Sequence, residues 1–363
     1  RFIILFNKKS KNIMIKAEIV AHSLSPQGDE LISVLATFPR IILAEVNTHR
    51  MLSKNTSSSR AIPFNKMVEA IENNPFIPIA WQRSHSGMQG TEYITDLAEI
   101  QGKNLMWLAG RDRAIQTAKD LHEADVTKQL ANRLLEPFMW TTMLITGPKS
   151  GWDNFFYLRC PQYELGIRDK SILFKSKKDY QSYLGLNGFG YQIPDEHWKI
   201  LNKGQAEIHM MALAESVWDA YNESTPKQLQ PGEWHIPFED KIGRFANIPL
   251  DSEVSNLEIE SNILINKVKT SVAMAARTSY TIVGEEKGLN YENLISLHDR
   301  LLTQDPPHSS PMEHCARAMS EDEYGSFYKG SGYDSPFGKG NGWCYNLKGF
   351  IPYRYFVDNG LVI

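Results

Sequence analysis

The stretch IKAEIVAHSLSPQGDELISVLATFPR, residues 15–40, places two apolar runs on either side of a turn sequence. Residues 15–22 and residues 30–37 carry β-branched and apolar side chains, and Ser-Pro-Gln-Gly lies between the two runs. Runs of this length that are bounded by Pro and Gly are typical of two strands joined in a β-hairpin. The stretch therefore predicts that the protein contains a sheet.

A helix is predicted directly after the hairpin. Ile42, Val46 and His49 recur at helical spacing, and the proline that begins this segment is tolerated in a first helical turn. Such a helix would carry His49 and Arg50 at its carboxyl end. The sequence SKNTSSSR at residues 53–60 follows, and we expect a loop there because hydroxyl and amide side chains compete with helical hydrogen bonds.

Most of the remaining chain is expected to be helical, because apolar residues recur at helical spacing over several long ranges. These ranges are 97–121, 130–143 with a break at Pro137, 151–159, 204–221, 264–279 and 290–302. Residues 160–203 interrupt this rhythm with charged, Gly- and Tyr-containing sequence, so we expect an inserted excursion there. Strands and helices together predict an α/β protein of the α+β type.

The composition is that of an ordinary soluble globular protein. The 363 residues are 42% hydrophobic, and 39 Lys and Arg stand against 42 Asp and Glu, which gives a net charge of −3. This balance of charges argues against a broad nucleic-acid or membrane-binding surface. The sequence also contains no run of about 18 apolar residues that could span a bilayer. Cys160, Cys315 and Cys344 form no CxxC pair, which indicates reduced thiols and a cytoplasmic location.

Residues 1–13 place a short apolar run ahead of a lysine cluster, which is the reverse of a secretory signal. Met14 opens the segment that leads into the first strand. We therefore expect residues 1–13 to be an upstream extension outside the core.

The segment THRMLSKNTSSSR, residues 48–60, is the first candidate site. Arg50 and Arg60 enclose a run of Ser, Thr and Asn side chains, so one short segment offers two guanidinium groups and many hydroxyl and backbone donors. This inventory suits a nucleotide phosphate or pyrophosphate. On composition alone, a solvated loop is the simpler interpretation.

The segment PHSSPMEHCARAM, residues 307–319, is the second candidate. His308, Glu313, His314 and Cys315 are potential metal ligands, yet the histidines lack the spacing of an HExxH site and no second cysteine lies nearby. We expect no metal here, and the favoured interpretation is structural, with Glu313 capping or pairing inside the fold.

Two further arginines lie within apolar helical sequence, Arg133 in ANRLLEPF and Arg159 in NFFYLR. A charge in such surroundings needs a partner. Glu136, Glu207 or an anionic ligand would each serve.

Taken together, these segments resemble the flavin-dependent thymidylate synthases, the ThyX family. Residues 48–60 are similar to the family signature R-H-R-x-x-S-x-N-E-x-S-x-R. The matching residues are His49, Arg50, Ser53, Asn55, Ser58 and Arg60. Thr48 stands where the family has its first arginine, and Thr56 stands where it has glutamate. Each departure removes a charge from the site that the resemblance implies.

Three further blocks carry the resemblance along the chain. NRLLEP (132–137) is similar to the family's arginine-bearing helix, NFFYLR (154–159) followed by GQAEI (204–208) resembles N-F-x-x-L-R…A-Q-x-E-I, and AARTSY (275–280) followed by HSSPMEH (308–314) resembles A-A-R-x-S and H-x-S-P-F-E-H. In typical members the last pair of blocks precedes the R-H-R segment, whereas here it follows. The longer phage-type members, with a G-M-Q segment like Gly87, Met88 and Gln89, look most similar.

The resemblance implies a ThyX-like fold with a circularly permuted motif order. It consists of an antiparallel or mixed sheet with a large helical part, in a single catalytic domain over residues 14–363, with 160–203 as the inserted excursion.

The resemblance also assigns roles to individual residues. FAD is expected to contact His49, Arg50, Ser53, Asn55 and Asn154 from one side, and Ser279, His308, Ser310 and Glu313 from the other. The phosphate of dUMP is expected to meet Ser58 and Arg60, with Arg133 assisting, while Arg159 reaches the uracil ring. Arg159 and His49 are the catalytic candidates, because a guanidinium can stabilise charge that develops on a pyrimidine.

The implied reaction is the reductive methylation of dUMP to dTMP. FAD reduced by NADPH supplies a hydride, and methylenetetrahydrofolate supplies the one-carbon unit.

Sites shared between subunits imply a homo-oligomer, which we expect to be a tetramer, with no membrane or nucleic-acid polymer as partner. No cysteine nucleophile is needed, so Cys160 is expected to be a structural thiol; the competing hypothesis is a thiol whose pKa the adjacent Arg159 lowers.

Two alternatives stay open because Thr48 and Thr56 depart from the family pattern. The first is a related flavoenzyme that changes uracil C5 differently, for instance by hydroxymethylation, or that accepts another pyrimidine nucleotide. The second is a catalytically silent flavin- or nucleotide-binding protein.

Overall fold

The computed structural model describes residues 14–86, 90, 92–167, 170–190, 192–242, 256–280, 283, 290–327 and 341–361. The expected extension at 1–13 and the G-M-Q segment at 87–89 lie outside these residues.

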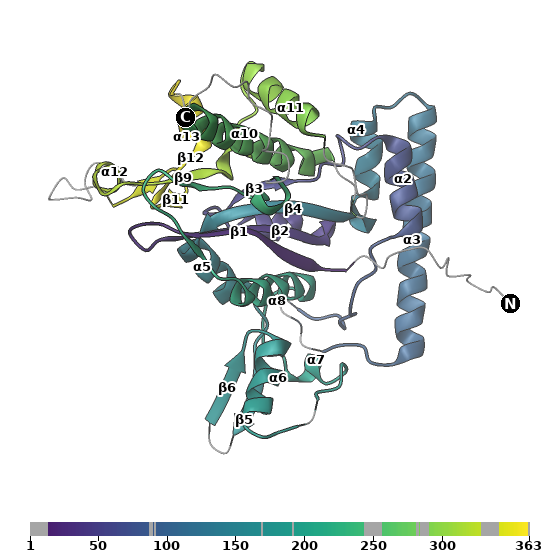
Figure 1. Cartoon of the computed structure of the whole chain (residues 1–363). Coiled ribbons are helices and arrows are strands. Elements are labelled where there is room, and N and C mark those ends of the chain that lie inside the picture. The colour runs from purple at the N-terminus through teal and green to yellow at the C-terminus, as the bar shows by residue number, and fades with distance from the viewer. Residues whose placement is uncertain are drawn as a thin grey trace.

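A five-stranded sheet with the order β3-β4-β2-β1-β7 forms the centre of the molecule (Figure 1). Its strands are β1 (Lys16–Leu24), β2 (Glu30–Pro39), β3 (Ser53–Thr56), β4 (Trp140–Pro148) and β7 (Lys227–Gln228). Neighbouring strands are antiparallel except β1 and β7, which are parallel. The α+β class and the mixed sheet are thus confirmed, while the circular permutation stays a prediction.

The predicted hairpin is formed by β1 and β2. Its turn contains Gly28 at φ +85°, a backbone conformation that favours glycine. The backbone N–H of Asp29 donates to Ser25 Oγ over 3.0 Å and closes the turn. Nearly every residue of β2 is buried, because both faces of the sheet are covered.

Two helices cover one face of the sheet (Figure 1), and both are close to the predicted ranges. They are α5 (Lys149–Arg159) and α8 (Ile208–Glu223). Val34 and Phe38 of β2 pack with Phe156 of α5 and Leu213 of α8 in one buried cluster.

The opposite face carries the described elements that follow β7. Its elements are α9 (Glu239–Ile242), α10 (Asn256–Arg277), α11 (Tyr291–Thr303), α12 (Glu321–Ser326) and α13 (Tyr353–Asp358), with a three-stranded sheet of β8 (Trp234–His235), β9 (Ala316–Ala318) and β12 (Phe350–Pro352) and the pair β10 (Trp343–Cys344) and β11 (Leu347–Lys348). Val272 and Ala276 of α10 pack against Leu144 of β4. The two helices predicted at 264–279 and 290–302 are confirmed as α10 and α11.

A helical lobe stands beside the sheet, where the long α3 runs next to α2 and α4 (Figure 1). It comprises α2 (Phe64–Asn73), α3 (Leu97–Glu123), α4 (Lys128–Ala131) and a 3₁₀-helix, Asn132–Phe138. Asp96 caps α3 by accepting from the backbone N–H of Glu99 over 2.7 Å.

Within residues 160–203, the chain leaves the main body beyond α8 and forms a small lobe of its own (Figure 1). The lobe holds β5 (Tyr163–Ile167), β6 (Lys170–Phe174), α6 (Lys177–Leu186) and α7 (Trp198–Leu201). Tyr163, Tyr180, Leu184 and Trp198 form a separate buried cluster, which explains how the segment folds outside the main core.

Two expectations of local structure are wrong. Ser53–Thr56 is not a loop but the edge strand β3, because its polar side chains find hydrogen-bond partners across the sheet and on α10. Met143 is not helical; it lies in the buried strand β4, and the helical segment before it ends as a 3₁₀-helix that contains Pro137.

The helix predicted from Pro39 is present but short. A 3₁₀-turn at Arg40–Ile42 leads into α1 (Leu43–Asn47), and His49 and Arg50 lie in the turn after its end rather than within it.

Candidate functional site

Strand β3 brings the first candidate segment to the face of the sheet that α10 covers. Ser53 and Asn55 alternate with the half-buried Lys54 and Thr56 and are both about 5% exposed. The side-chain amide of Asn55 donates to the carbonyl oxygen of Ala275 over 2.5 Å. The hydroxyl of Thr278 donates to the same carbonyl oxygen of Ala275 over 2.6 Å and also lies 3.3 Å from the carbonyl oxygen of Asn55. This side chain therefore anchors the end of α10 on β3.

The second candidate segment meets the first at the same place. Ser310 Oγ donates to Asn55 Oδ1 over 3.0 Å, and the backbone N–H of Ser58 donates to the carbonyl oxygen of Ser279 over 3.0 Å. The two blocks that the resemblance places on either side of FAD thus meet within one chain through these residues. Because both ends of the Asn55 amide are engaged by the protein, Asn55 holds the two segments together, and its contact with a cofactor stays a prediction.

Arg159 at the end of α5 is held by two residues of the turn that precedes β3. Its Nε donates to His49 Nε2 over 3.0 Å, and its terminal nitrogen donates to Thr48 Oγ1 over 3.3 Å. An arginine only donates, so His49 must be neutral with its proton on Nδ1. Burial, together with the positive charges of Arg159 and Lys54, lowers the pKa of His49 to about 4.

Thr48 replaces the first arginine of the family signature at this contact. Its hydroxyl donates to the carbonyl oxygen of Glu45 over 2.6 Å and accepts from Arg159. An arginine here would set two positive charges against each other. The departure from the signature therefore provides Arg159 with a neutral acceptor.

Lys54 is a residue of this site that the sequence did not reveal. Its ammonium group donates to the carbonyl oxygens of His49 and Leu52 over 2.5 and 3.0 Å. Burial lowers its pKa to about 8, while the nearby Glu313 opposes this shift. No sequence pattern singles out Lys54, because it reaches this site only through the pairing of β3 with β4.

The far end of the first segment is fastened to the helical lobe. Ser59 Oγ donates to Glu136 Oε1 over 2.5 Å, and the side-chain amide of Asn132 donates to the carbonyl oxygen of Ser59 over 2.7 Å. Arg60 and Arg133 each follow directly after one member of the Ser59–Asn132 pair, and both are exposed. The structure thus brings two guanidinium-bearing segments together.

Glu136 is not the partner of Arg133 that the sequence suggested. Its carboxylate accepts instead from Arg40, at 3.3 Å, and from Ser59. Glu207, the other suggested partner, accepts from the backbone N–H groups that open α8. Within the described ranges, Arg133 has no carboxylate partner.

The remaining predicted site residues differ in exposure. Arg50, Asn154 and His308 are exposed, whereas Ser279 and Ser310 are half-buried. The described pockets do not gather these side chains into one cavity.

Glu313 pairs inside the fold, as the structural interpretation expected. Its Oε1 accepts from the guanidinium of Arg354 over 2.5 Å. Together with Ser53, the two side chains border a cavity of about 190 Å³ between β3 and the C-terminal segment.

His314 and Cys315 turn away from Glu313 into the core. His314 Nδ1 bonds Thr146 Oγ1 at 2.8 Å, and Cys315 donates to Ser271 Oγ over 3.1 Å. Burial lowers the pKa of His314 to about 3 and raises that of Cys315 to about 12. The side chains considered as potential metal ligands are thus directed to different partners, and among the described residues no three His, Cys, Asp or Glu approach closely enough to hold a metal ion.

A buried chain of hydrogen bonds continues from His314 across the sheet. It runs from Thr146 to Ser33 at 2.6 Å, to His235 Nε2 at 2.8 Å and from His235 Nδ1 to Ser23 at 2.9 Å. His314 Nε2 is buried and has no partner in the described part of the chain. An unpaired acceptor costs less than an unpaired donor, so we assign the His314 proton to Nδ1, which orients every hydroxyl toward Ser23.

Cys160 is 5% exposed and packs in the cluster beneath α5 and α8. Burial raises the pKa of this thiol, and Lys175 opposes the rise only in part. Both observations favour a structural thiol over an activated Cys160. The adjacent Arg159 is directed to His49 instead.

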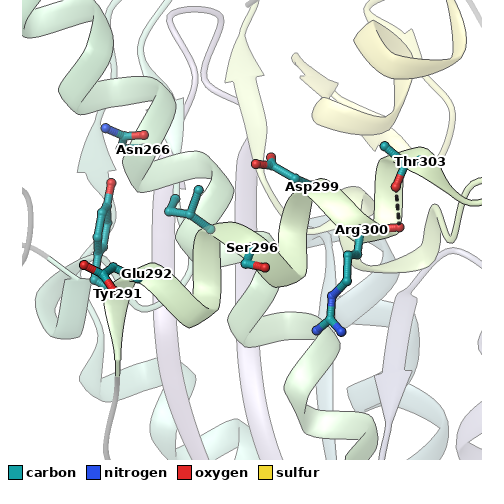
Figure 2. A pocket seen from close by; sticks show the side chains of 8 residues that line it. Asn266, Tyr291, Glu292, Ser296, Asp299, Arg300 and Thr303 are labelled. Carbon is teal, nitrogen blue, oxygen red and sulfur yellow. Dashed lines mark hydrogen bonds between the residues drawn. The ribbon is translucent and has the colours of Figure 1, made fainter.

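A separate groove of about 600 Å³ lies between α10 and α11 (Figure 2). Figure 2 shows Asn266 on one side and Tyr291, Glu292, Ser296, Asp299, Arg300 and Thr303 on the other. None of the predicted site residues borders it.

No helix in the described ranges is long and apolar enough to cross a membrane.

Comparisons with known proteins add little to this geometry. No family model and no curated protein matches the chain. Among solved structures, a UMP/dUMP methylase (PolB) from Streptomyces cacaoi bound with 5-Br dUMP aligns with a TM-score of 0.39 at 11% identity over 58% of this chain and 92% of that one. The same methylase bound with 5-Br UMP aligns with a TM-score of 0.37 at 14% identity, over 58% and 89%. Similarity at this level carries no weight for function, which is argued below from the residues.

Proposed function

We propose that this chain is a flavin-dependent enzyme that methylates C5 of dUMP, as the flavin-dependent thymidylate synthases do. The observation that carries the proposal is the hydrogen bond between Ser310 and Asn55, 255 positions apart. Each residue belongs to one of the two motif blocks that the resemblance identifies. Their contact supports one site built from both blocks.

The available side chains suit FAD. Arg50 and His308 are exposed donors on the two joined segments, and a guanidinium matches the oxygens of a diphosphate. Glu313 uses only Oε1 within the described residues, so Oε2 is left to accept from a hydroxyl or ring N–H. When bound, FAD would supply the hydride, with NADPH and methylenetetrahydrofolate as co-substrates.

The nucleotide is expected to bind beside this position. Arg60 and Arg133 offer two exposed guanidinium groups where the Ser59–Asn132 bond joins their segments, and Ser58 adds a hydroxyl, which together suit the phosphate of dUMP. His49 and Thr48 hold Arg159 at the other end of β3. We assign Arg159 the role of stabilising negative charge on the uracil carbonyl groups.

The proposed site needs a second copy of the chain. The cavity beside Glu313 is about 190 Å³, below the roughly 300 Å³ at which ligand pockets usually begin. Arg50, Arg60 and Arg133 are exposed, so a ligand bound to them within one chain would stay open to solvent. We propose that a neighbouring subunit of a homo-oligomer, expected to be a tetramer, covers it.

The test combines a spectrum with product analysis. Purified protein is expected to show the absorbance of oxidised flavin and to convert dUMP, methylenetetrahydrofolate and NADPH into dTMP, identified by mass. A hydroxymethylated product would replace this proposal by the related flavoenzyme. Flavin binding without turnover, and without rescue of a thymidine auxotroph, would indicate the silent binding protein.

A further inference from the structure

The C-terminal segment from Trp343 to Asp358 follows the last block of the family resemblance, so no role comes to it from the motifs. It lies directly over the Glu313 region, since β12 pairs with β9 and the backbone N–H of Tyr353 donates to the carbonyl oxygen of Cys315 over 2.8 Å. The side-chain amide of Asn346 also donates to the carbonyl oxygen of Arg50 over 3.4 Å. The segment therefore touches both halves of the candidate site.

Arg354 is fixed in this segment independently of Glu313. Its Nε donates to Asp358 Oδ2 over 3.2 Å, and its guanidinium lies 5.7 Å from the centre of the Tyr345 ring. The Tyr345 hydroxyl donates to the same oxygen of Asp358 over 2.8 Å. A guanidinium held on two sides presents its remaining N–H groups in a set direction, because its donors form a rigid plane.

Tyr345 has a φ of 52°, which is unusual for a non-glycine residue. Such a conformation persists only where the surroundings impose it, and it recurs at functional sites. Here it accompanies the placement of the Tyr345 ring beside Arg354 at the edge of the cavity that Glu313 and Ser53 border.

We propose that Arg354 is a positioning residue for Glu313 and that the C-terminal segment forms one wall of the flavin site. Arg354 engages Oε1 of Glu313 and fixes the carboxylate, which leaves Oε2 to accept from a ligand hydroxyl or ring N–H. The side chains of Glu313 and Arg354 are 24% and 36% exposed, so the pair is open to a ligand and not sealed in the core. This inference rests on the proposed function, since the ligand is FAD.

The experiment measures the dissociation constant of FAD by fluorescence titration of the full chain. Arg354→Met is expected to weaken binding about tenfold, the loss of one charge-assisted contact, and Arg354→Lys to recover part of it. Arg300→Met is the matched control, because Arg300 is exposed on α11 beside the separate groove (Figure 2). It is expected to bind FAD as the wild type does.

A double-mutant cycle separates positioning from a general structural effect. In a Glu313→Gln background, Arg354→Met is expected to leave FAD affinity unchanged, because the residue through which it acts is already altered. Wild-type affinity in Arg354→Met, or an equal loss in both backgrounds, would overturn the proposal alone. Failure of the wild-type chain to bind FAD would overturn the proposed function together with it.

Discussion

The two ends of the candidate site differ in how the chain uses its polar side chains. At the joined end, Asn55, Thr278 and Ser310 are hydrogen-bonded to one another or to backbone across segments far apart in sequence. At the open end, Arg60 and Arg133 are exposed. The polar residues of these segments therefore differ, since some hold the framework together and others are exposed to solvent.

This difference makes the two ends separable by experiment. Substitutions at the joined end leave buried groups unsatisfied and should lower the free energy of unfolding. Substitutions at the open end remove charges that water already solvates, and they should lower ligand affinity with little change in stability. Arg159 and His49 lie between these cases, because they bond to each other and are also the residues proposed to act on the substrate.

Arg159→Met is expected to have the largest effect. Losing a group that stabilises charge in a transition state lowers turnover by about 10²- to 10³-fold. The rate of dTMP formation is the measurement, with Arg113→Met, an exposed arginine of α3, as the control. Turnover like that of the wild type would show that Arg159 only connects α5 to the turn before β3.

Acid should weaken the joint between His49 and Arg159. The pKa of His49 is lowered from 6.5 to about 4, so its neutral form contributes stability above pH 6.5 that is lost as the pH falls through about 4. The loss is about 3 kcal/mol at most, at about 1.4 kcal/mol per pKa unit. Urea unfolding of the wild type and of His49→Gln, which keeps an acceptor but does not titrate, measures it.

The difference between the wild type and His49→Gln isolates the contribution of His49 titration to stability. His235 and His314 are also held neutral by burial, but they titrate alike in both. The wild type should lose more stability than His49→Gln between pH 6.5 and 4. Parallel losses would mean that the Arg159 contact does not depend on the charge of His49.

Asn55→Ala tests the joined end. It leaves the hydroxyl of Ser310 without its partner and removes one of two side-chain bonds to the carbonyl oxygen of Ala275, which keeps its bond from Thr278; a buried unsatisfied group costs about 1–3 kcal/mol. We expect a loss of about 2 kcal/mol in urea unfolding, against less than about 0.5 kcal/mol for Asn65→Ala on the exposed side of α2. Equal costs would show that the segments are held together by packing instead.

Much of the fold could be predicted from periodicity. The β1–β2 hairpin and the helices α5, α8, α10 and α11 follow from apolar spacing, because each helix buries one stripe against the rest of the fold. The helix α3 is also present as predicted, but Leu97 and Leu105 of its expected stripe are exposed. Strand β3 could not be predicted in this way. Its residues are polar, and their burial depends on partners in β4 and α10 that are remote in sequence.

The candidate site, like the fold, has a part that the sequence predicts and a part that depends on tertiary contacts. The motifs identified the segments that meet, and the Ser310–Asn55 bond confirms that they do. They did not identify Lys54, Arg354 or the Glu136–Arg40 pair, because a single charged residue carries no spacing signal. Only the tertiary arrangement shows that Arg354 reaches Glu313 from 41 positions away.

Arg60→Ala and Arg133→Ala test the open end. Each is expected to weaken dUMP binding about tenfold, or about 1.4 kcal/mol, through loss of a charge-assisted contact with the phosphate. Calorimetric titration with dUMP and with deoxyuridine gives the measurement, because the nucleoside lacks the phosphate. A similar loss for deoxyuridine would place these arginines elsewhere in the site.

Cys160→Ala is expected to have the smallest effect on activity. The thiol is buried and burial raises its pKa, so almost none of it is thiolate near neutral pH, and the proposed reaction uses no cysteine nucleophile. Turnover should equal that of the wild type, while the free energy of unfolding falls by about 1 kcal/mol through lost packing. Turnover abolished with FAD still bound would instead assign Cys160 a direct chemical role, and it would separate this chain from the family that its motifs resemble.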